Sequence, residues 1–200
     1  MAVTALVFYA LFGVLGFGWR SALQYQRTGS TGFRGVNGRP GSLEWIAGTG
    51  FVVAIALGVV APALQLAAVL HPIGVLTTPA VQTMGIVLAL AGIVGTLYAQ
   101  NQMGESWRIG VDPTETTDLV RTGVFGLVRN PIFTAMLVFA AGITLLTPNP
   151  LALIGFALLL ATIELQVRVV EEPYLRDRHG DTYRTYSRTV GRFVPRVGLT

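Results

Sequence analysis

The chain has 200 residues, enough for one domain of ordinary size, but 52% of them are hydrophobic and only 12% are charged. With a mean hydropathy of +0.60, this composition excludes an ordinary soluble domain and predicts a membrane protein. All 14 basic residues are arginines, and their spread along the chain argues against nucleic-acid binding. The absence of cysteine excludes disulfides and thiolate chemistry, and with only two histidines we expect no metal site.

Apolar runs long enough to cross a bilayer, which takes about 20 residues, recur along the chain. The first, residues 2–19, reads as a signal peptide or as a retained span. The lack of a basic start and of a small-residue cleavage site favours the span. Four further runs follow, at about residues 45–69, 81–98, 131–146 and 151–167. The sequence therefore predicts an all-α integral membrane protein with about five transmembrane helices.

Two local patterns predict how these helices pack. The third run is rich in small residues (Gly85, Ala89, Gly92 and Gly95), which allow two helices to approach closely in a membrane. The fourth and fifth runs are joined only by "TPNP", residues 147–150, so we expect a tight helical hairpin.

The arginines also predict the orientation in the membrane. Every basic residue lies in the loop after the first run, in the loop after the third run, or in the tail. Basic loops stay on the cytoplasmic side of a membrane. We therefore expect a protein of the cell (inner) membrane, with its N-terminus outside and its C-terminus in the cytoplasm. The long polar segment of residues 100–130 and the charged tail then share one face and can meet there.

The fourth run begins with Asn130 and Pro131 in "RTGVFGLVRNPIF". Proline suits the first helical position, because it needs no amide hydrogen there, and asparagine is a natural N-cap. One interpretation is that these residues only start a helix. The other is that the helix N-terminus offers its free N–H groups and positive dipole end to an anionic ligand.

Glu164 falls about one turn inside the end of the fifth run, where an ionised carboxylate needs a partner or a wet cavity. Helical spacing places it on one face with Arg168 and Glu171, and Glu172 follows Arg168 at i+4. This face is either an ion-pair ladder at the membrane boundary or the wall of a polar cavity that holds a charged ligand.

Aromatic residues outside the runs have plainer interpretations. Tyr183 and Tyr186, with arginines on another face, are typical of an amphipathic helix that lies at the membrane surface. Trp107 is typical of an aromatic anchor at the membrane boundary.

Taken together, "TTDLVRTGVFGLVRNPIF", the hairpin and "RVVEEPYLRDRHGDTYRTYSRTVGRFVP" resemble the isoprenylcysteine carboxyl methyltransferase family and its bacterial relatives. The resemblance covers about the last hundred residues with its order and spacing intact. It rests on Leu119, Val120, Gly123, Phe125, Arg129, Asn130, Pro131 and Phe133, and then on Glu171, Glu172, Gly180, Tyr183, Tyr186 and Pro195.

The resemblance implies an enzyme that binds S-adenosylmethionine in a cytoplasmic pocket, between the loop before the fourth helix and the segment after the fifth. Residues 100–200 would be the catalytic region, and residues 1–99 would supply the first three helices. The cofactor would contact Thr117, Asp118, Leu119, Val120, Phe125, Asn130, Pro131, Ile132, Phe133 and Glu172, with Glu171 in place of Glu172 if the register differs by one. Arg168 would orient a carboxylate acceptor, and Glu164 would serve as base if the acceptor is an alcohol or an amine.

Three residues depart from the family pattern: Asn130 stands where His is usual, and Phe133 and Phe125 stand where Tyr is usual. Stacking and backbone contacts to the cofactor survive these changes, but the acceptor is left open. We expect a lipophilic acceptor that enters sideways from the lipid, with membrane lipids as partners and a carboxylate as first choice. The rival functions are an NADPH-dependent reductase of the sterol or steroid type and a small non-enzymatic membrane carrier.

Overall fold

The computed structural model describes residues 1–32, 35–36, 38–107 and 118–200, and this part of the chain is helical with no strand. The first helix runs through α1 (Ala2–Phe12), a π-helical turn η1 (Gly13–Trp19) and α2 (Arg20–Thr28). The main helices that follow are α3 (Leu43–Leu66), α4 (Pro79–Met103), α5 (Pro131–Leu146), α6 (Pro150–Gln166) and α7 (Glu172–Thr189). Shorter helical segments are η2 (Gly74–Leu76), η3 (Gly104–Ser106), η4 (Gly123–Gly126) and the π-helical η5 (Val167–Glu171).

Four described helices are long and apolar enough to cross a membrane: Ala2–Thr28, Leu43–Leu66, Pro79–Met103 and the apolar part of Pro150–Thr189. The helix α5 is apolar but has only 16 residues, or roughly 24 Å, less than a hydrocarbon core. The prediction of an all-α integral membrane protein is confirmed, with four to five apolar helices rather than five equal spans.

The helices pack mainly as two pairs, α4 with α5 and α3 with α6. In the first pair the backbones touch: a Cβ on Gly92 would lie 2.5 Å from the backbone nitrogen of Phe139, and one on Gly142 would lie 2.4 Å from that of Ala89. A methyl group fits at neither position. The predicted close packing of the third run is therefore confirmed.

Asn149 fixes the hairpin between α5 and α6. Its side-chain oxygen accepts a hydrogen bond from the backbone nitrogen of Ala152 at 2.9 Å and so caps α6. Its Nδ2 donates to the backbone oxygen of Ala61 at 3.2 Å and to the side chain of Gln65 at 2.9 Å. Because both of these partners belong to α3, one buried amide links the start of α6 to α3.

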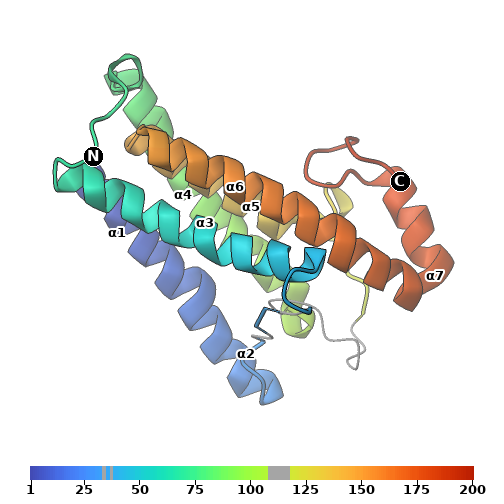
Figure 1. Cartoon of the computed structure of the whole chain (residues 1–200). Coiled ribbons are helices and arrows are strands. Elements are labelled where there is room, and N and C mark those ends of the chain that lie inside the picture. Colours follow the sequence, from blue (N-terminus) through green and yellow to red (C-terminus); the bar gives the residue numbers. More distant parts are fainter. Residues whose placement is uncertain (33–34, 37, 108–117) are drawn as a thin grey trace.

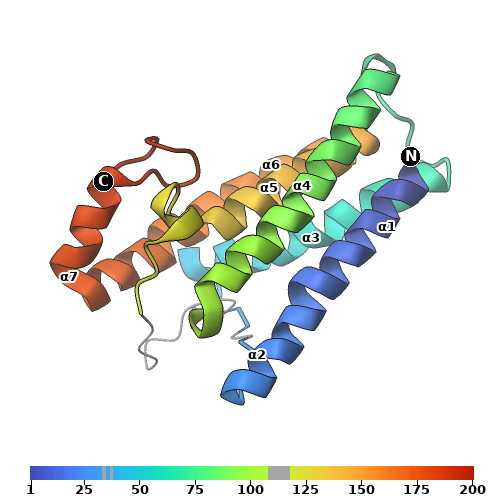
Figure 2. The same ribbon diagram turned by 180° about the vertical axis from the view of Figure 1, so that it is seen from behind.

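The helices form a bundle in which the N-terminus and α7 lie at opposite ends (Figures 1 and 2). At the α7 end the α6 helix continues through η5 into α7, and the chain bends at Gly180, whose φ of 51° suits glycine (Figure 1). The helix α1–α2 diverges from α3 toward this same end (Figures 1 and 2). The polar parts of the chain thus gather at one end of the bundle.

Candidate functional site

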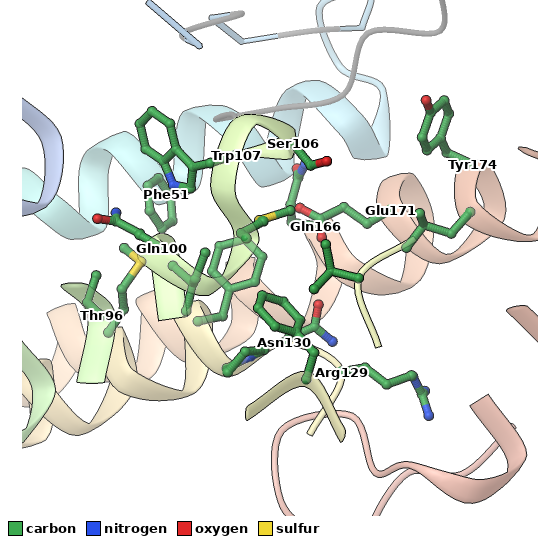
Figure 3. A pocket seen from close by; sticks show the side chains of 18 of the residues that line it. Phe51, Thr96, Gln100, Ser106, Trp107, Arg129, Asn130, Gln166, Glu171 and Tyr174 are labelled. Atoms are coloured by element: carbon green, nitrogen blue, oxygen red, sulfur yellow. The ribbon is translucent and has the colours of Figure 1, made fainter. Parts of the chain in front are cut away.

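A cavity of about 700 Å³ occupies the α7 end of the bundle, and such a volume suits a small-molecule ligand. Its walls come from η1, α2, α3, the end of α4, η3, the segment before α5, the first turns of α5, and η5 with α7. Most lining side chains are apolar or aromatic, and polar side chains such as Gln100, Asn130 and Glu171 are set among them (Figure 3). Such a site places a ligand by shape and by a small set of hydrogen bonds.

The segment before α5 supplies one wall of this cavity, through Asp118, Leu119, Val120 and Phe125. Each of them was a predicted cofactor contact. Thr117, predicted with them, lies outside the described residues. The wall is fixed at Phe125, whose backbone oxygen accepts a 2.6 Å hydrogen bond from the hydroxyl of Tyr186.

The first turn of α5 supplies the next part of the wall, through Asn130, Pro131, Ile132 and Phe133. Asn130 occupies the N-cap position as predicted, but its side chain does not cap the helix. Its Nδ2 instead donates to the backbone oxygen of Arg192 at 3.2 Å. The expected side-chain cap is therefore wrong, because the tail competes for the amide. The first turn of α5 is left without a side-chain cap.

Glu172 lies at the centre of a buried charge cluster and is not among the described residues that line the cavity. Its carboxylate accepts hydrogen bonds from Arg129 at 2.8 Å, from Arg192 at 2.6 and 3.1 Å, and from Arg176 at 3.0 Å. Burial raises the pKa of Glu172, but the hydrogen bonds and charges of Arg192 and Arg129 outweigh it and bring the pKa below its ordinary value. The carboxylate is ionised and already satisfied.

Arg129 joins the segment before α5 to the tail. Its guanidinium donates to the backbone oxygens of Ser187 at 2.9 Å, of Gly198 at 3.0 Å and of Val190. Its backbone nitrogen donates to the oxygen of Gly191 at 2.8 Å. The expectation that the polar loop and the charged tail meet is confirmed by these contacts.

Glu171, the neighbour of Glu172, does line the cavity. The sequence left a choice between two carboxylates, and in the structure Glu171 is the one that reaches the cavity. Figure 3 shows it on the side of the cavity formed by η5 and α7, near Tyr174.

Arg168 and Glu164, the predicted catalytic residues, form an i,i+4 ion pair at 2.6 Å. Their side chains are 58% and 35% exposed, and neither is among the described residues that line the cavity. In the chain, Arg168 lies between two lining residues, Gln166 and Glu171. The pair therefore lies beside the cavity rather than in it.

Two tyrosines of α7 were assigned to a membrane-surface helix, but Tyr183 and Tyr186 are buried and line the cavity. Their rings meet edge to face with centroids 6.1 Å apart. Burial raises the pKa of Tyr183 to about 12, so its hydroxyl is neutral at physiological pH. The spacing of the two residues predicted one helix face correctly but not what covers it.

Sequence reasoning also missed lining residues outside the resemblance. Trp107 is 2% exposed rather than a surface anchor, and the guanidinium of Arg20 lies 4.8 Å from its ring centre. Thr96 and Gln100 line the cavity from α4. Polar residues one turn apart near the end of an apolar helix were the available signal for this last pair.

Known proteins with similar sequences are methyltransferases. A sequence model of the phospholipid methyltransferase family matches residues 81–182, just over half of the chain. A probable protein-S-isoprenylcysteine O-methyltransferase of Oryza sativa subsp. indica is 28% identical over 117 residues, which are 58% of this chain and 61% of that protein. The protein-S-isoprenylcysteine O-methyltransferase of Saccharomyces cerevisiae is 30% identical over 122 residues, which are 60% of this chain and 51% of that protein.

The chain thus spans between half and two thirds of the length of these curated relatives. The fold is similar to the solved structure of the eukaryotic intramembrane Ras methyltransferase isoprenylcysteine carboxyl methyltransferase. The TM-score is 0.62 at 21% identity, over 96% of this chain and 64% of that one. These relatives confirm the predicted resemblance. Since the family model covers residues from α4 through most of α7, which form much of the cavity wall, the chain belongs to the phospholipid methyltransferase family.

Proposed function

We propose that this protein transfers a methyl group from S-adenosylmethionine to a lipophilic acceptor in the membrane. The observation that carries the proposal is the cavity at the α7 end, which joins an uncapped helix N-terminus and two carboxylates to an aromatic and apolar wall. Membership of a methyltransferase family and similarity to isoprenylcysteine methyltransferases support the same reaction class.

The residues present fit this cofactor. The uncapped first turn of α5 suits the carboxylate of its methionine part, because free N–H groups and the helix dipole favour an anion. Phe125 and Phe133 offer apolar surfaces to the adenine. Asp118 and Glu171 offer carboxylate acceptors to hydroxyl and ammonium groups. When bound there, the cofactor supplies an electrophilic methyl group.

Leu119, Val120, Pro131 and Ile132 complete this proposed cofactor wall with apolar surface. Glu172 contributes differently. Its hydrogen bonds to Arg129 and Arg192 hold the loop before α5 against the tail, so we assign it to positioning the wall rather than to cofactor contact.

The acceptor would reach the cavity from the lipid, between η1 and α3. Gly18 of η1 and Val52 of α3 both line the cavity and are both exposed, as expected at an opening between the two helices. Phe17, Phe51 and Ile55 continue this wall inward with apolar side chains. An amphiphile can therefore place its chain here and its polar end toward the cofactor wall.

With a carboxylate acceptor the reaction neutralises charge, so it depends on alignment and on exclusion of water more than on acid or base groups. We assign Arg168 to orienting such a carboxylate at the edge of the cavity. An exposed i,i+4 ion pair contributes only about 0.3–0.5 kcal/mol of stability. Arg168 can therefore leave Glu164 and bind the acceptor carboxylate at little cost in free energy. For an alcohol or amine acceptor, Glu164 is the proposed base.

We also propose that the cavity opens on the cytoplasmic side of a cell membrane, with the N-terminus outside. The described arginines lie at the α7 end of the bundle, in α2, in the loops beside it, and in the tail. This distribution supports the orientation by the positive-inside rule.

The test is a thermal-shift titration of the detergent-purified protein with S-adenosylmethionine, S-adenosylhomocysteine and NADPH. We expect both adenosyl compounds to raise the unfolding midpoint and NADPH to have no effect. Asp118→Asn should weaken this response, whereas Asp181→Asn, at an exposed residue paired with Arg184 outside the cavity, should preserve it. Stabilisation by NADPH alone would replace the proposal with the reductase, and no response to any of the three compounds would favour the carrier.

A further inference from the structure

Two polar side chains on α4 are nearly inaccessible to solvent yet line the cavity. Thr96 and Gln100 are 1% and 3% exposed, and they lie one helical turn apart on one face of the helix. Neither belongs to the segments proposed to hold the cofactor. The residues between them, Leu97, Tyr98 and Ala99, are apolar or aromatic, and the polar Asn101 and Gln102 follow in the last turn of α4.

The amide of Gln100 is oriented by one hydrogen bond. Its Nε2 donates to the backbone oxygen of Gly16 at 2.8 Å, and the reversed amide would set two oxygens against each other. The remaining atom, Oε1, is buried and accepts no hydrogen bond from the described residues. Gln100 therefore presents an acceptor in need of a donor.

The hydroxyl of Thr96 makes no hydrogen bond within the described part of the chain either. Other buried threonines in the transmembrane helices behave differently. Thr144 donates to the backbone oxygen of Ala140 at 2.9 Å, and Thr162 donates to that of Leu158 at 2.9 Å. A buried polar group without a partner is costly, so two such groups side by side indicate a ligand.

Their place in the cavity indicates which ligand. Figure 3 shows Thr96 and Gln100 toward one end of the cavity, and Glu171 and Tyr174 toward the other. The Thr96 and Gln100 end also includes η1, whose Gly16 accepts the hydrogen bond from Gln100, and Phe51 of α3 (Figure 3). It is therefore the part assigned to the acceptor rather than to the cofactor.

We propose that Thr96 and Gln100 bind a neutral hydrogen-bond donor of the acceptor, an O–H or N–H group next to its apolar chain. A hydroxyl donates to Oε1 of Gln100 and accepts from the hydroxyl of Thr96, so it satisfies both side chains at once. A carboxylate has no hydrogen to donate and would face Oε1 with negative charge. The group that meets this pair is thus distinct from any carboxylate to be methylated. The inference rests on the proposed function, because that function makes this end the acceptor site.

The test uses dodecan-1-ol and its methyl ether, which differ only in the donor, with the protein in lipid nanodiscs and without cofactor. Binding is followed as the rise of the unfolding midpoint with the concentration of each compound in the lipid. This concentration is measured separately for the alcohol and the ether, so that unequal partitioning does not enter the ratio of their affinities. We expect the wild type to prefer the alcohol by about 3- to 10-fold, the value of one or two net hydrogen bonds. Thr96→Val and Gln100→Met should each reduce this preference.

Thr144→Val is the matched control, because Thr144 is also buried but has its own backbone partner and does not line the cavity. It should retain the preference for the alcohol. Thr96→Val should also raise the midpoint of the ligand-free protein, since it removes an unsatisfied group, whereas a structural hydroxyl would lower it. An equal affinity for alcohol and ether in the wild type, or an unchanged preference in Thr96→Val, overturns the inference. Since no cofactor is present, this result is independent of the adenosyl titration.

Discussion

Arg129 and Glu172 are 43 positions apart in the chain and form an ion pair at 2.8 Å, with side chains only 2% and 3% exposed. The pair joins the loop that leads into α5 to the start of α7, and Arg192 of the tail shares the same carboxylate. Because that loop forms one wall of the cavity and the tail supports it, the shape of the site depends on this cluster.

Glu172→Gln should therefore destabilise the protein strongly. The change leaves the buried Arg129 and Arg192 without their counter-charge, a loss of about 3–5 kcal/mol in comparable buried pairs. The measurement is the unfolding midpoint of the purified protein. Glu164→Gln is the matched control, since its exposed pair with Arg168 is worth about 0.5 kcal/mol or less. Equal midpoints in the two variants would show that the cluster contributes little.

The same carboxylate predicts a dependence of stability on pH. The pKa of Glu172 in the folded protein lies below its ordinary value of 4.5, so protonation favours the unfolded chain. The stabilisation is complete above about pH 4.5 and is lost as the pH falls through the lower folded pKa. Midpoints measured between about pH 6 and about pH 3 should fall less steeply in Glu172→Gln than in the wild type. Parallel curves for the two proteins would contradict this assignment.

Val52→Trp should slow the access of the acceptor from the lipid. Val52 lines the cavity and is 55% exposed, so a larger ring there should narrow the proposed opening beside η1. We expect kcat/KM for a lipophilic acceptor to fall about tenfold, with cofactor binding unchanged. Val53→Trp is the control, because Val53 is also exposed but does not line the cavity. A similar loss in both variants would exclude this route.

Arg168→Ala should lower kcat/KM for a carboxylate acceptor at least about tenfold while the unfolding midpoint stays unchanged. The reason is that Arg168 is exposed beside the cavity, where its loss removes an orienting charge but no buried contact. Arg184→Ala removes another exposed arginine, one paired with Asp181 at 2.8 Å, and should change neither quantity. Full turnover in Arg168→Ala would show that Arg168 and Glu164 form only a surface ion pair, with no role in the reaction.

The helices themselves were predictable from the sequence, because transmembrane helices depend on local runs of apolar residues. The close packing of α4 was predictable too, since Gly92 has no side chain to keep a neighbouring helix away, but only the structure shows that this neighbour is α5. The hydrogen-bond partners of two residues could not be predicted from the local sequence. Asn130 gives its side-chain amide to Arg192 instead of to its own helix, and Glu172 has two of its three arginine partners far away in the chain.

Hydropathy and ordered motifs are properties of the chain, so the sequence alone predicted that the protein lies in a membrane, that its fold is all-α, and which family it resembles. Only the tertiary structure shows which side chains line the cavity. Glu171 and Glu172 are neighbours with the same chemistry, yet one lines the cavity and the other is enclosed by arginines. Thr96 and Gln100 gain their significance only because the folded chain leaves them buried and without a complete set of partners. Whether a polar atom is satisfied is a property of its surroundings, and these exist only in the folded protein.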